Sequence, residues 1–281
     1  MLKLMMQGQT SQVWEANEIS SGRHFAVKML LPENTRSPEH RQFLFHEAEV
    51  GLKLHHKNVM RVVHLIRSKD NPYMVMEYFP GGNLEVRLQL KQELIKENAH
   101  WIIEQAATGL AFIHDKGWVH RDVKPANILV NSSAEVKIID FALSKRITRR
   151  RGLFARIFKR RGQKTQGTRS YMSPEQIVND YLDERADVYS FGATFYEVVT
   201  GRPPFRGLTP GDLLNRHLRD TPVTPQSHSP NLTDECAKLI LKMLSKKRDD
   251  RPRNFHEFLS AFRTTRVFKG DKLERRKEKY S

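Results

Sequence analysis

An eight-residue run, His120-Arg-Asp-Val-Lys-Pro-Ala-Asn127, brings an acid, a cation and an amide close together. Asp122 has a carboxylate that can orient a hydroxyl group and accept its proton. Lys124 can place a positive charge over a migrating phosphoryl group, and the amide oxygen of Asn127 is a hard ligand suited to Mg²⁺. Phosphoryl transfer uses these groups together, so the segment predicts that chemistry.

The run resembles the catalytic loop of protein kinases, and this resemblance implies a second metal ligand after the next strand. Asp140 stands at that place, directly behind the apolar run Val136-Lys-Ile-Ile139. The cofactors implied are ATP and Mg²⁺, with Mn²⁺ as a possible substitute. The roles implied are Asp122 as catalytic base, Lys124 as catalytic cation, and Asn127 and Asp140 as metal ligands.

The sequence Ala26-Val-Lys28 resembles the strand of protein kinases whose lysine holds the α- and β-phosphates of ATP. In the family this lysine pairs with a glutamate on the following helix. Glu47 lies 47 − 28 = 19 residues further on, within a predicted helix. The resemblance therefore pairs Lys28 with Glu47.

Met76-Glu-Tyr-Phe79 resembles the hinge that binds adenine, with Met76 as gatekeeper. Backbone groups of Glu77 and Phe79 would then face the ring. Three apolar side chains would lie against its two faces, where packing and ligand binding coincide: Val13, Ala26 and Leu129.

Residues 167–175 look like the end of an activation segment that docks a protein substrate. Arg251 is placed to form an ion pair with Glu175, and Asp187 is placed to brace the catalytic loop. All three would be structural residues. The resemblance extends over residues 3–262 and implies an ATP-dependent protein kinase that also phosphorylates itself.

Two residues favour serine and threonine as acceptors. Tyrosine kinases usually lack a lysine at the position of Lys124, and Thr168 resembles the threonine that bridges Lys124 and Asp122. The style of the chain, including residues 171–176, is similar to bacterial Hanks-type kinases. Arg121 directly precedes Asp122, an arrangement that pairs with a phosphorylated activation segment in resembling kinases. Candidate phosphorylation sites are Thr165 and, second, Thr148.

The chain departs from the family pattern at three places. The phosphate-covering loop has Met6, Gly8 and Ser11 where three glycines are usual, so only Gly8 keeps the backbone open to phosphates. Ala142 replaces the glycine after Asp140-Phe141. Gly51 stands where a larger apolar residue normally joins the helix to the catalytic loop. These departures predict weaker ATP binding and an enzyme that is incomplete until something orders the helix.

These groups need a fold that holds them on both sides of a cleft. Strands are predicted over 12–16, 25–30, 73–77, 128–130 and 136–139, and helices over 39–54, 94–114, 187–200, 210–219, 234–245 and 255–262. The expected class is α+β, a bilobal protein-kinase-like fold. Residues 1–78 form a small β-rich N-lobe, residues 79–262 form a larger helical C-lobe, and residues 263–281 form a basic tail.

The net charge of +16 favours acidic partners or anionic surfaces. Residues 145–164, within the activation segment 140–175, carry ten basic side chains and no acidic one. No run reaches the ~20 apolar residues of a membrane span, and the single cysteine, Cys236, excludes an internal disulfide. The expected location is cytoplasmic, with membrane association open.

The basic insertion 145–164 also has four apolar residues at helical offsets, Leu153, Phe154, Ile157 and Phe158. A basic amphipathic helix could lie on an anionic membrane or dock on an acidic protein. Nucleic acid is a weaker candidate, because it does not call for the apolar residues. A solvated basic loop without a partner is the plain alternative.

Two other functions stay open. A kinase-fold scaffold without activity is favoured by the altered glycine loop, Ala142 and Gly51, although a scaffold has no need of both metal ligands and the base. A small-molecule phosphotransferase is disfavoured by residues 167–175 and by Arg251, which resemble machinery for a protein substrate.

Overall fold

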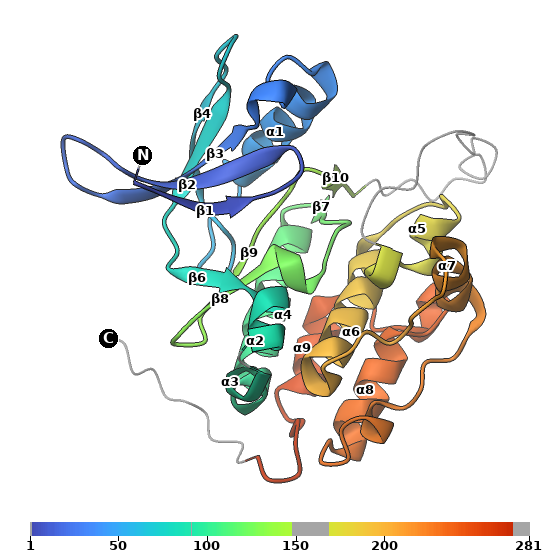
Figure 1. The fold of residues 1–281 in the computed structure, drawn as a ribbon. Coiled ribbons are helices and arrows are strands. Elements are labelled where there is room, and N and C mark those ends of the chain that lie inside the picture. Colours follow the sequence, from blue (N-terminus) through green and yellow to red (C-terminus); the bar gives the residue numbers. More distant parts are fainter. Residues whose placement is uncertain (1, 91, 148–168, 272–281) are drawn as a thin grey trace.

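The first part of the chain folds into an antiparallel sheet of five strands in the order β1-β2-β3-β5-β4 (Figure 1). The computed structural model describes residues 2–90, 92–147 and 169–271. The strands are β1 (Lys3–Gln7), β2 (Ser11–Asn17), β3 (His24–Leu30), β4 (Val62–Ile66) and β5 (Tyr73–Glu77). A short 3₁₀ turn, Pro32–Asn34, follows β3.

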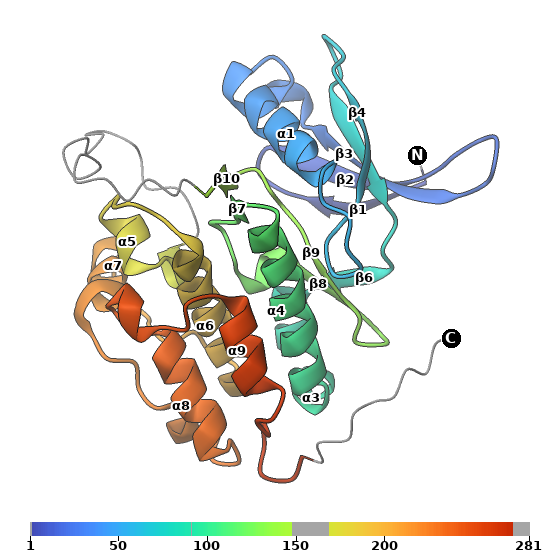
Figure 2. The same cartoon turned by 180° about the vertical axis from the view of Figure 1, so that it is seen from behind.

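Helix α1 (Pro38–Gly51) packs on this sheet against β3, β4 and β5 (Figure 2). Its start is encoded locally, because the Ser37 hydroxyl accepts a hydrogen bond from the His40 N–H and Pro38 opens the helix. Leu44 and Ala48 are buried one turn apart. Glu47 lies on the same side of the helix, so burying this face also brings a carboxylate under the sheet.

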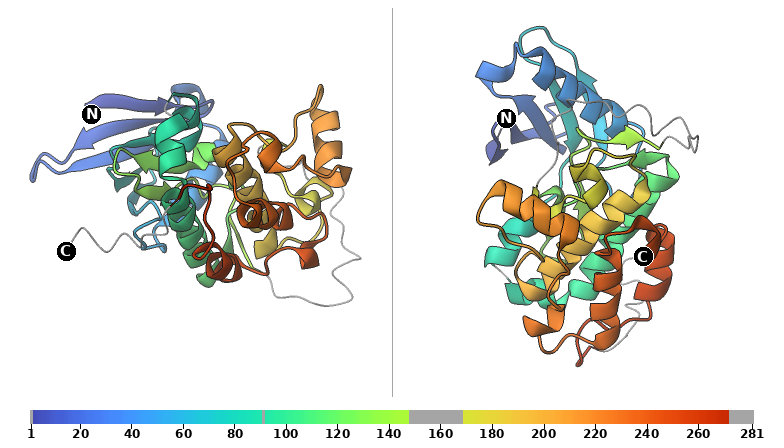
Figure 3. Two further views of the ribbon diagram at one scale, coloured as in Figure 1. Left: turned by 90° about the horizontal axis from the view of Figure 1, so that it is seen from below. Right: turned by 90° about the vertical axis from the view of Figure 1, so that its right-hand side faces the viewer.

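The rest of the described chain is mainly helical and lies below the sheet (Figure 3). The helices are α2 (Leu84–Leu90), α3 (Gln92–Glu97), α4 (Ala99–Asp115), α5 (Pro174–Ile177), α6 (Glu184–Thr200), α7 (Pro210–Arg219), α8 (Asp234–Met243) and α9 (Phe255–Phe262). Short 3₁₀ turns lie at Pro125–Asn127, Arg169–Tyr171, Pro225–Ser227 and Arg248–Asp250. Helices α4 and α6 contact each other and pack against α9 and α8, respectively, so they form the centre of this core.

Two small sheets lie where the strand-rich and helical parts meet. Strands β6 (Gly81–Asn83), β8 (Ile128–Asn131) and β9 (Val136–Ile138) pair in the order β6-β8-β9. Strands β7 (Trp118–Val119) and β10 (Lys145–Arg146) form an antiparallel pair. These short strands flank the segment 120–127 and position it at the interface.

The predicted α+β, bilobal class is confirmed, since a five-stranded antiparallel sheet is followed by a helical region. One helix prediction was wrong. The expected single helix over 94–114 is two helices, α3 and α4, separated at Asn98. The Asn98 side chain donates to the Leu94 carbonyl at 2.9 Å, and this local bond competes with the helical pattern.

The boundary of the tail also needs correction. Residues 263–271, which were expected to belong to a basic tail, pack on the helical part. Val267 is fully buried in its core, and the Thr233 N–H donates to the Val267 carbonyl at 3.1 Å. Phe268 forms an isolated bridge with Leu232. Apolar residues within the basic sequence therefore extend the folded part to at least residue 271.

None of the helices in the described ranges combines the length and apolar character that a membrane crossing needs.

Candidate active site

The segment 120–127 is fixed from below by Asp187 of α6. This buried carboxylate accepts the backbone N–H groups of His120 at 2.7 Å and Arg121 at 2.8 Å, and it contacts Nε2 of His114 at 2.8 Å. Burial raises the pKa of Asp187, but the bonds from His114 and the nearby charges outweigh burial and lower it. An ionised carboxylate thus holds Arg121 in a left-handed conformation with φ of 71°.

Asp122 lies at the centre of three polar contacts. Its Oδ2 atom is 2.7 Å from Nζ of Lys124. The amide nitrogen of Asn127 donates to the same Oδ2 at 3.0 Å and to the Asp122 carbonyl at 2.8 Å. Because the Asn127 nitrogen is committed to Asp122, its amide oxygen is the atom that can bind a cation.

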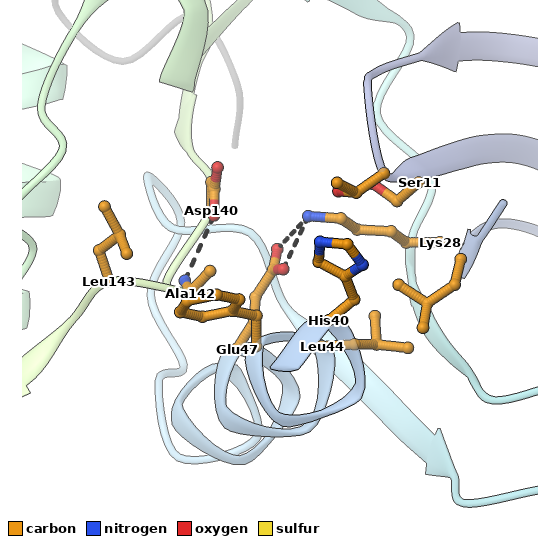
Figure 4. Close-up of a pocket in the computed structure, with 11 residues that line it drawn as sticks. Ser11, Lys28, His40, Leu44, Glu47, Asp140, Ala142 and Leu143 are labelled. Carbon is orange, nitrogen blue, oxygen red and sulfur yellow. Dashed lines mark hydrogen bonds and ion pairs between the residues drawn. The ribbon is translucent and has the colours of Figure 1, made fainter. Parts of the chain in front are cut away.

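Lys28 of β3 and Glu47 of α1 form a bidentate ion pair with distances of 2.8 and 2.7 Å (Figure 4). Glu47 is only 4% exposed. Burial lowers the pKa of Lys28, but the carboxylates of Glu47 and Asp140 outweigh this effect and raise it. The lysine of β3 therefore stays charged.

Lys28 and Glu47 line a pocket with a volume of about 220 Å³. Asp140, which follows β9, lines this pocket as well. Figure 4 shows Asp140 on the side of the pocket opposite β3, with Lys28 and Glu47 reaching in from that strand and from α1. Burial raises the pKa of Asp140, but Lys28, His120 and the Ala142 N–H together lower it. The pocket thus holds an ionised carboxylate near a lysine ammonium, an arrangement suited to a metal ion and a polyanion.

The adenine-facing residues expected from the sequence gather in one apolar cluster. Ala26, Met76 and Phe79 are buried there, and Val13 and Leu129 pack against them partly buried. The Glu77 N–H donates to the Arg61 carbonyl at 3.0 Å, and the Phe79 carbonyl accepts from Gly81 at 2.8 Å. The cluster lies between the five-stranded sheet, which contributes Ala26 and Met76, and the β6-β8-β9 sheet, which contributes Leu129.

Gly8 lies exposed in the turn between β1 and β2, where its N–H donates to the Ser11 carbonyl at 2.8 Å. A Cβ at this position would meet that carbonyl oxygen at 3.5 Å, an ordinary contact. The protein itself therefore does not demand glycine here. Its proposed role depends on a ligand that approaches the backbone.

Gly51 is the last residue of α1. A Cβ at Gly51 would lie 2.3 Å from Cγ2 of Val62 and 3.6 Å from Cδ2 of Phe141. Val62 of β4 therefore fills the space that a larger residue at position 51 would occupy. No gap is left at position 51, because the side chain of Val62 closes it.

Comparisons with known proteins agree with this geometry. A family model described as "protein kinase domain" matches residues 2–261. The chain belongs to the protein kinase family. The kinase is 32% identical over 248 residues to the serine/threonine-protein kinase PknB of Mycobacterium leprae, an alignment that covers 87% of this chain and 39% of the relative.

A probable serine/threonine-protein kinase of Streptomyces coelicolor is 31% identical over 249 residues, covering 87% of this chain and 36% of that protein. A probable serine/threonine-protein kinase of Clostridium acetobutylicum is 32% identical over 262 residues, an alignment that covers 90% of this chain and 37% of that protein. The chain therefore spans less than two fifths of the length of these curated relatives. Its similarity to bacterial serine/threonine kinases confirms the predicted Hanks-type family.

The kinase also contains the Glu175–Arg251 ion pair, with distances of 2.7 and 3.0 Å. The Arg251 side chain is fully buried and donates further to the carbonyls of Arg185, Ser245 and Lys246. Its guanidinium lies 4.8 Å from the centre of the Tyr189 ring. This pair joins α5, which contains Glu175, to the helical core.

The oxygen atoms of the kinase that could bind a metal fit Mg²⁺ held together with nucleotide phosphates. Within the described ranges no cluster of three or more His, Cys, Asp or Glu side chains could hold a metal alone. Asp140 supplies one carboxylate and Asn127 one amide oxygen. Magnesium is commonly bound by one or two carboxylates together with substrate phosphates, so a sparse protein ligand set is expected.

Several predicted residues lie outside the described residues of the kinase: Thr148, Thr165, Thr168 and the insertion from residue 148 to residue 164. The start of the insertion, Lys145–Arg146, is strand β10. Sequence reasoning missed His114 as a partner of Asp187 and Val62 as the side chain beside Gly51. A helical histidine and a strand valine carry no local signal for either contact.

Proposed function

We propose that this kinase transfers the γ-phosphate of ATP to serine or threonine of protein substrates, including itself. The observation that carries the proposal is the contact of Asp122 with both Lys124 and Asn127. Asp122 would orient the acceptor hydroxyl and take its proton, while Lys124 stabilises the developing negative charge. Lys124 and the names of the relatives support serine and threonine as acceptors.

Bound ATP supplies the phosphoryl group, and Mg²⁺, or Mn²⁺ in its place, neutralises the charge of the phosphates. Asn127 and Asp140 would hold the metal, and Lys28, oriented by Glu47, would hold the α- and β-phosphates. The apolar cluster around Ala26 and Leu129 would enclose the adenine ring, with Met76 behind it.

The direct test is transfer of labelled phosphate from ATP with Mg²⁺, to the kinase itself and to a generic protein. We expect phosphoserine or phosphothreonine, and we expect the label to disappear when EDTA removes the metal. Mass spectrometry should find Thr165, or second Thr148, among the modified residues, because Arg121 can pair with a phosphate. An active enzyme with no phosphate between residues 144 and 170 would contradict the activation site, and phosphotyrosine alone would contradict the acceptor class.

We further propose that the basic insertion 145–164 attaches a cytoplasmic kinase to anionic membrane surfaces. The support is its composition, ten basic residues together with the four apolar residues at helical offsets, Leu153, Phe154, Ile157 and Phe158. Replacing Phe154 and Phe158 by serine should reduce binding to anionic vesicles, and added salt should weaken the remainder. Equal binding to neutral and anionic vesicles, or none to either, would remove the membrane proposal. Binding to an acidic protein or nucleic acid alone would redirect it.

A further inference from the structure

Helix α1 is tied to the segment that follows Asp140 by a hydrogen bond of His46. Nε2 of His46 lies 2.7 Å from the backbone carbonyl oxygen of Ser144, although the two residues are 98 positions apart. The acceptor is a carbonyl, so Nε2 must carry the proton. Both the neutral Nε2–H tautomer and the imidazolium ring can donate this bond. Within the described ranges it links an α1 side chain to the start of the activation segment.

The carbonyl that accepts this bond is held on the helical side. Ser144 is 1% exposed, and its N–H donates to the Phe141 carbonyl at 3.0 Å. The next two residues form β10, which pairs with β7 directly before the catalytic loop. The Ile147 N–H continues this pairing by donating to the Gly117 carbonyl at 2.9 Å. The His46 bond can therefore form only while residues 141–147 keep this position beside the catalytic loop.

The ring of His46 is also packed in one orientation. It lies edge-on to Trp118 of β7, with ring centres 6.0 Å apart and planes at 65°. The guanidinium of Arg146 covers Trp118 at 4.4 Å, and its Nη1 donates to the Lys116 carbonyl at 2.9 Å. Figures 1 and 2 both show β7 and β10 below α1, on the side of the helical part. The contact thus joins three elements that are distant in sequence.

His46 immediately precedes Glu47, the residue that orients Lys28. We propose that His46 is a positioning residue that makes the Lys28–Glu47 ion pair depend on the position of residues 141–147. When these residues leave the observed place, α1 loses its bond to Ser144 and Glu47 is no longer held toward Lys28. This inference rests on the proposed phosphate transfer. The His46 bond links α1 to residues 141–147. This link does not need a side chain at position 51, where α1 ends on Gly51.

The test separates the hydrogen bond from the packing. His46→Phe keeps an aromatic ring against Trp118 but removes the donor, whereas His46→Gln keeps an amide N–H donor of similar reach. Loss of one hydrogen bond predicts a drop in kcat/KM for ATP of about 5- to 10-fold in His46→Phe. We expect His46→Gln to recover most of the loss. His64→Phe, at an exposed histidine on β4, serves as the matched control and should match the parent.

A second arm shows whether His46 acts through Glu47. In a Glu47→Gln background the ion pair is already broken, so adding His46→Phe should change kcat/KM by less than about 2-fold. A full 5- to 10-fold loss in that background, or parental kcat/KM in His46→Phe alone, would overturn the proposal. Loss in His46→Gln equal to that in His46→Phe would overturn it as well, because a restored N–H donor would then recover nothing.

Hydrogen exchange of the α1 backbone amides gives a readout that does not need phosphate transfer. We expect faster exchange in α1 for His46→Phe, with parental rates for His64→Phe and little change in α6 of any variant. If no protein transfers phosphate and α1 still exchanges faster in His46→Phe, the proposed function fails while the link between His46 and α1 stands. Unchanged exchange in α1 overturns the link itself.

Discussion

Replacing Asp122 by asparagine is expected to slow phosphate transfer by about 10²- to 10⁴-fold, the usual contribution of a general acid or base. The amide cannot accept the proton of the acceptor hydroxyl. Binding of Mg-ATP should remain close to that of the parent, because Asp122 contacts Lys124 and Asn127 rather than the expected metal position. Single-turnover transfer of labelled phosphate measures the rate, and calorimetry measures nucleotide binding.

Two further variants serve as comparisons for Asp122→Asn, one expected to lose nucleotide binding and one expected to behave like the parent. Asp140→Asn should weaken Mg-ATP binding as well as transfer, because it replaces the buried carboxylate of the pocket. Asp70→Asn, at an exposed aspartate between β4 and β5, should behave like the parent. If Asp122→Asn kept parental turnover, the assignment of the catalytic base would be wrong. If it lost nucleotide binding to the same degree as Asp140→Asn, the two roles would not be separate.

Replacing Arg251 by methionine is expected to destabilise the fold by about 3–5 kcal/mol, the cost of leaving one charge of a buried ion pair without its partner. The Glu175 carboxylate would lose both of its bonds to Arg251 while only 4% of the residue is exposed. Three backbone carbonyls would lose a donor as well. For a chain of this size, Tm should fall by roughly 10 °C or more in a thermal unfolding experiment.

An exposed ion pair provides the matched control. Arg253 contacts Glu257 at 2.9 Å, but 85% of its side chain is exposed, so Arg253→Met should cost less than about 1 kcal/mol. The double variant Arg251→Met, Glu175→Leu should recover part of the loss, since an apolar pair leaves no unpaired charge. Equal Tm values for Arg251→Met and Arg253→Met would contradict a buried structural role for Arg251.

Local sequence signals determined much of this fold. The predicted limits of α7, α9 and β5 agree with the structure, and proline or side-chain caps mark the starts of α7 and α9. The segment 120–127, Asp140 and the separation of Lys28 from Glu47 were sufficient to predict a kinase-type site. Such signals act within a strand, a turn or one helix. For this reason the sequence alone could state which chemistry the residues support.

Other features depended on the whole fold. The pairing of β7 with β10, Val62 beside Gly51, and His46 on the Ser144 carbonyl each join residues that are far apart or meet without a sequence pattern. Val267 is buried although it lies in a basic, polar segment. Side-chain type fixes what a group can bind, but its partner is decided by which surfaces are brought together when the sheet and helices pack. The tertiary structure therefore decided how α1, the segment 120–127 and the segment after Asp140 contact one another.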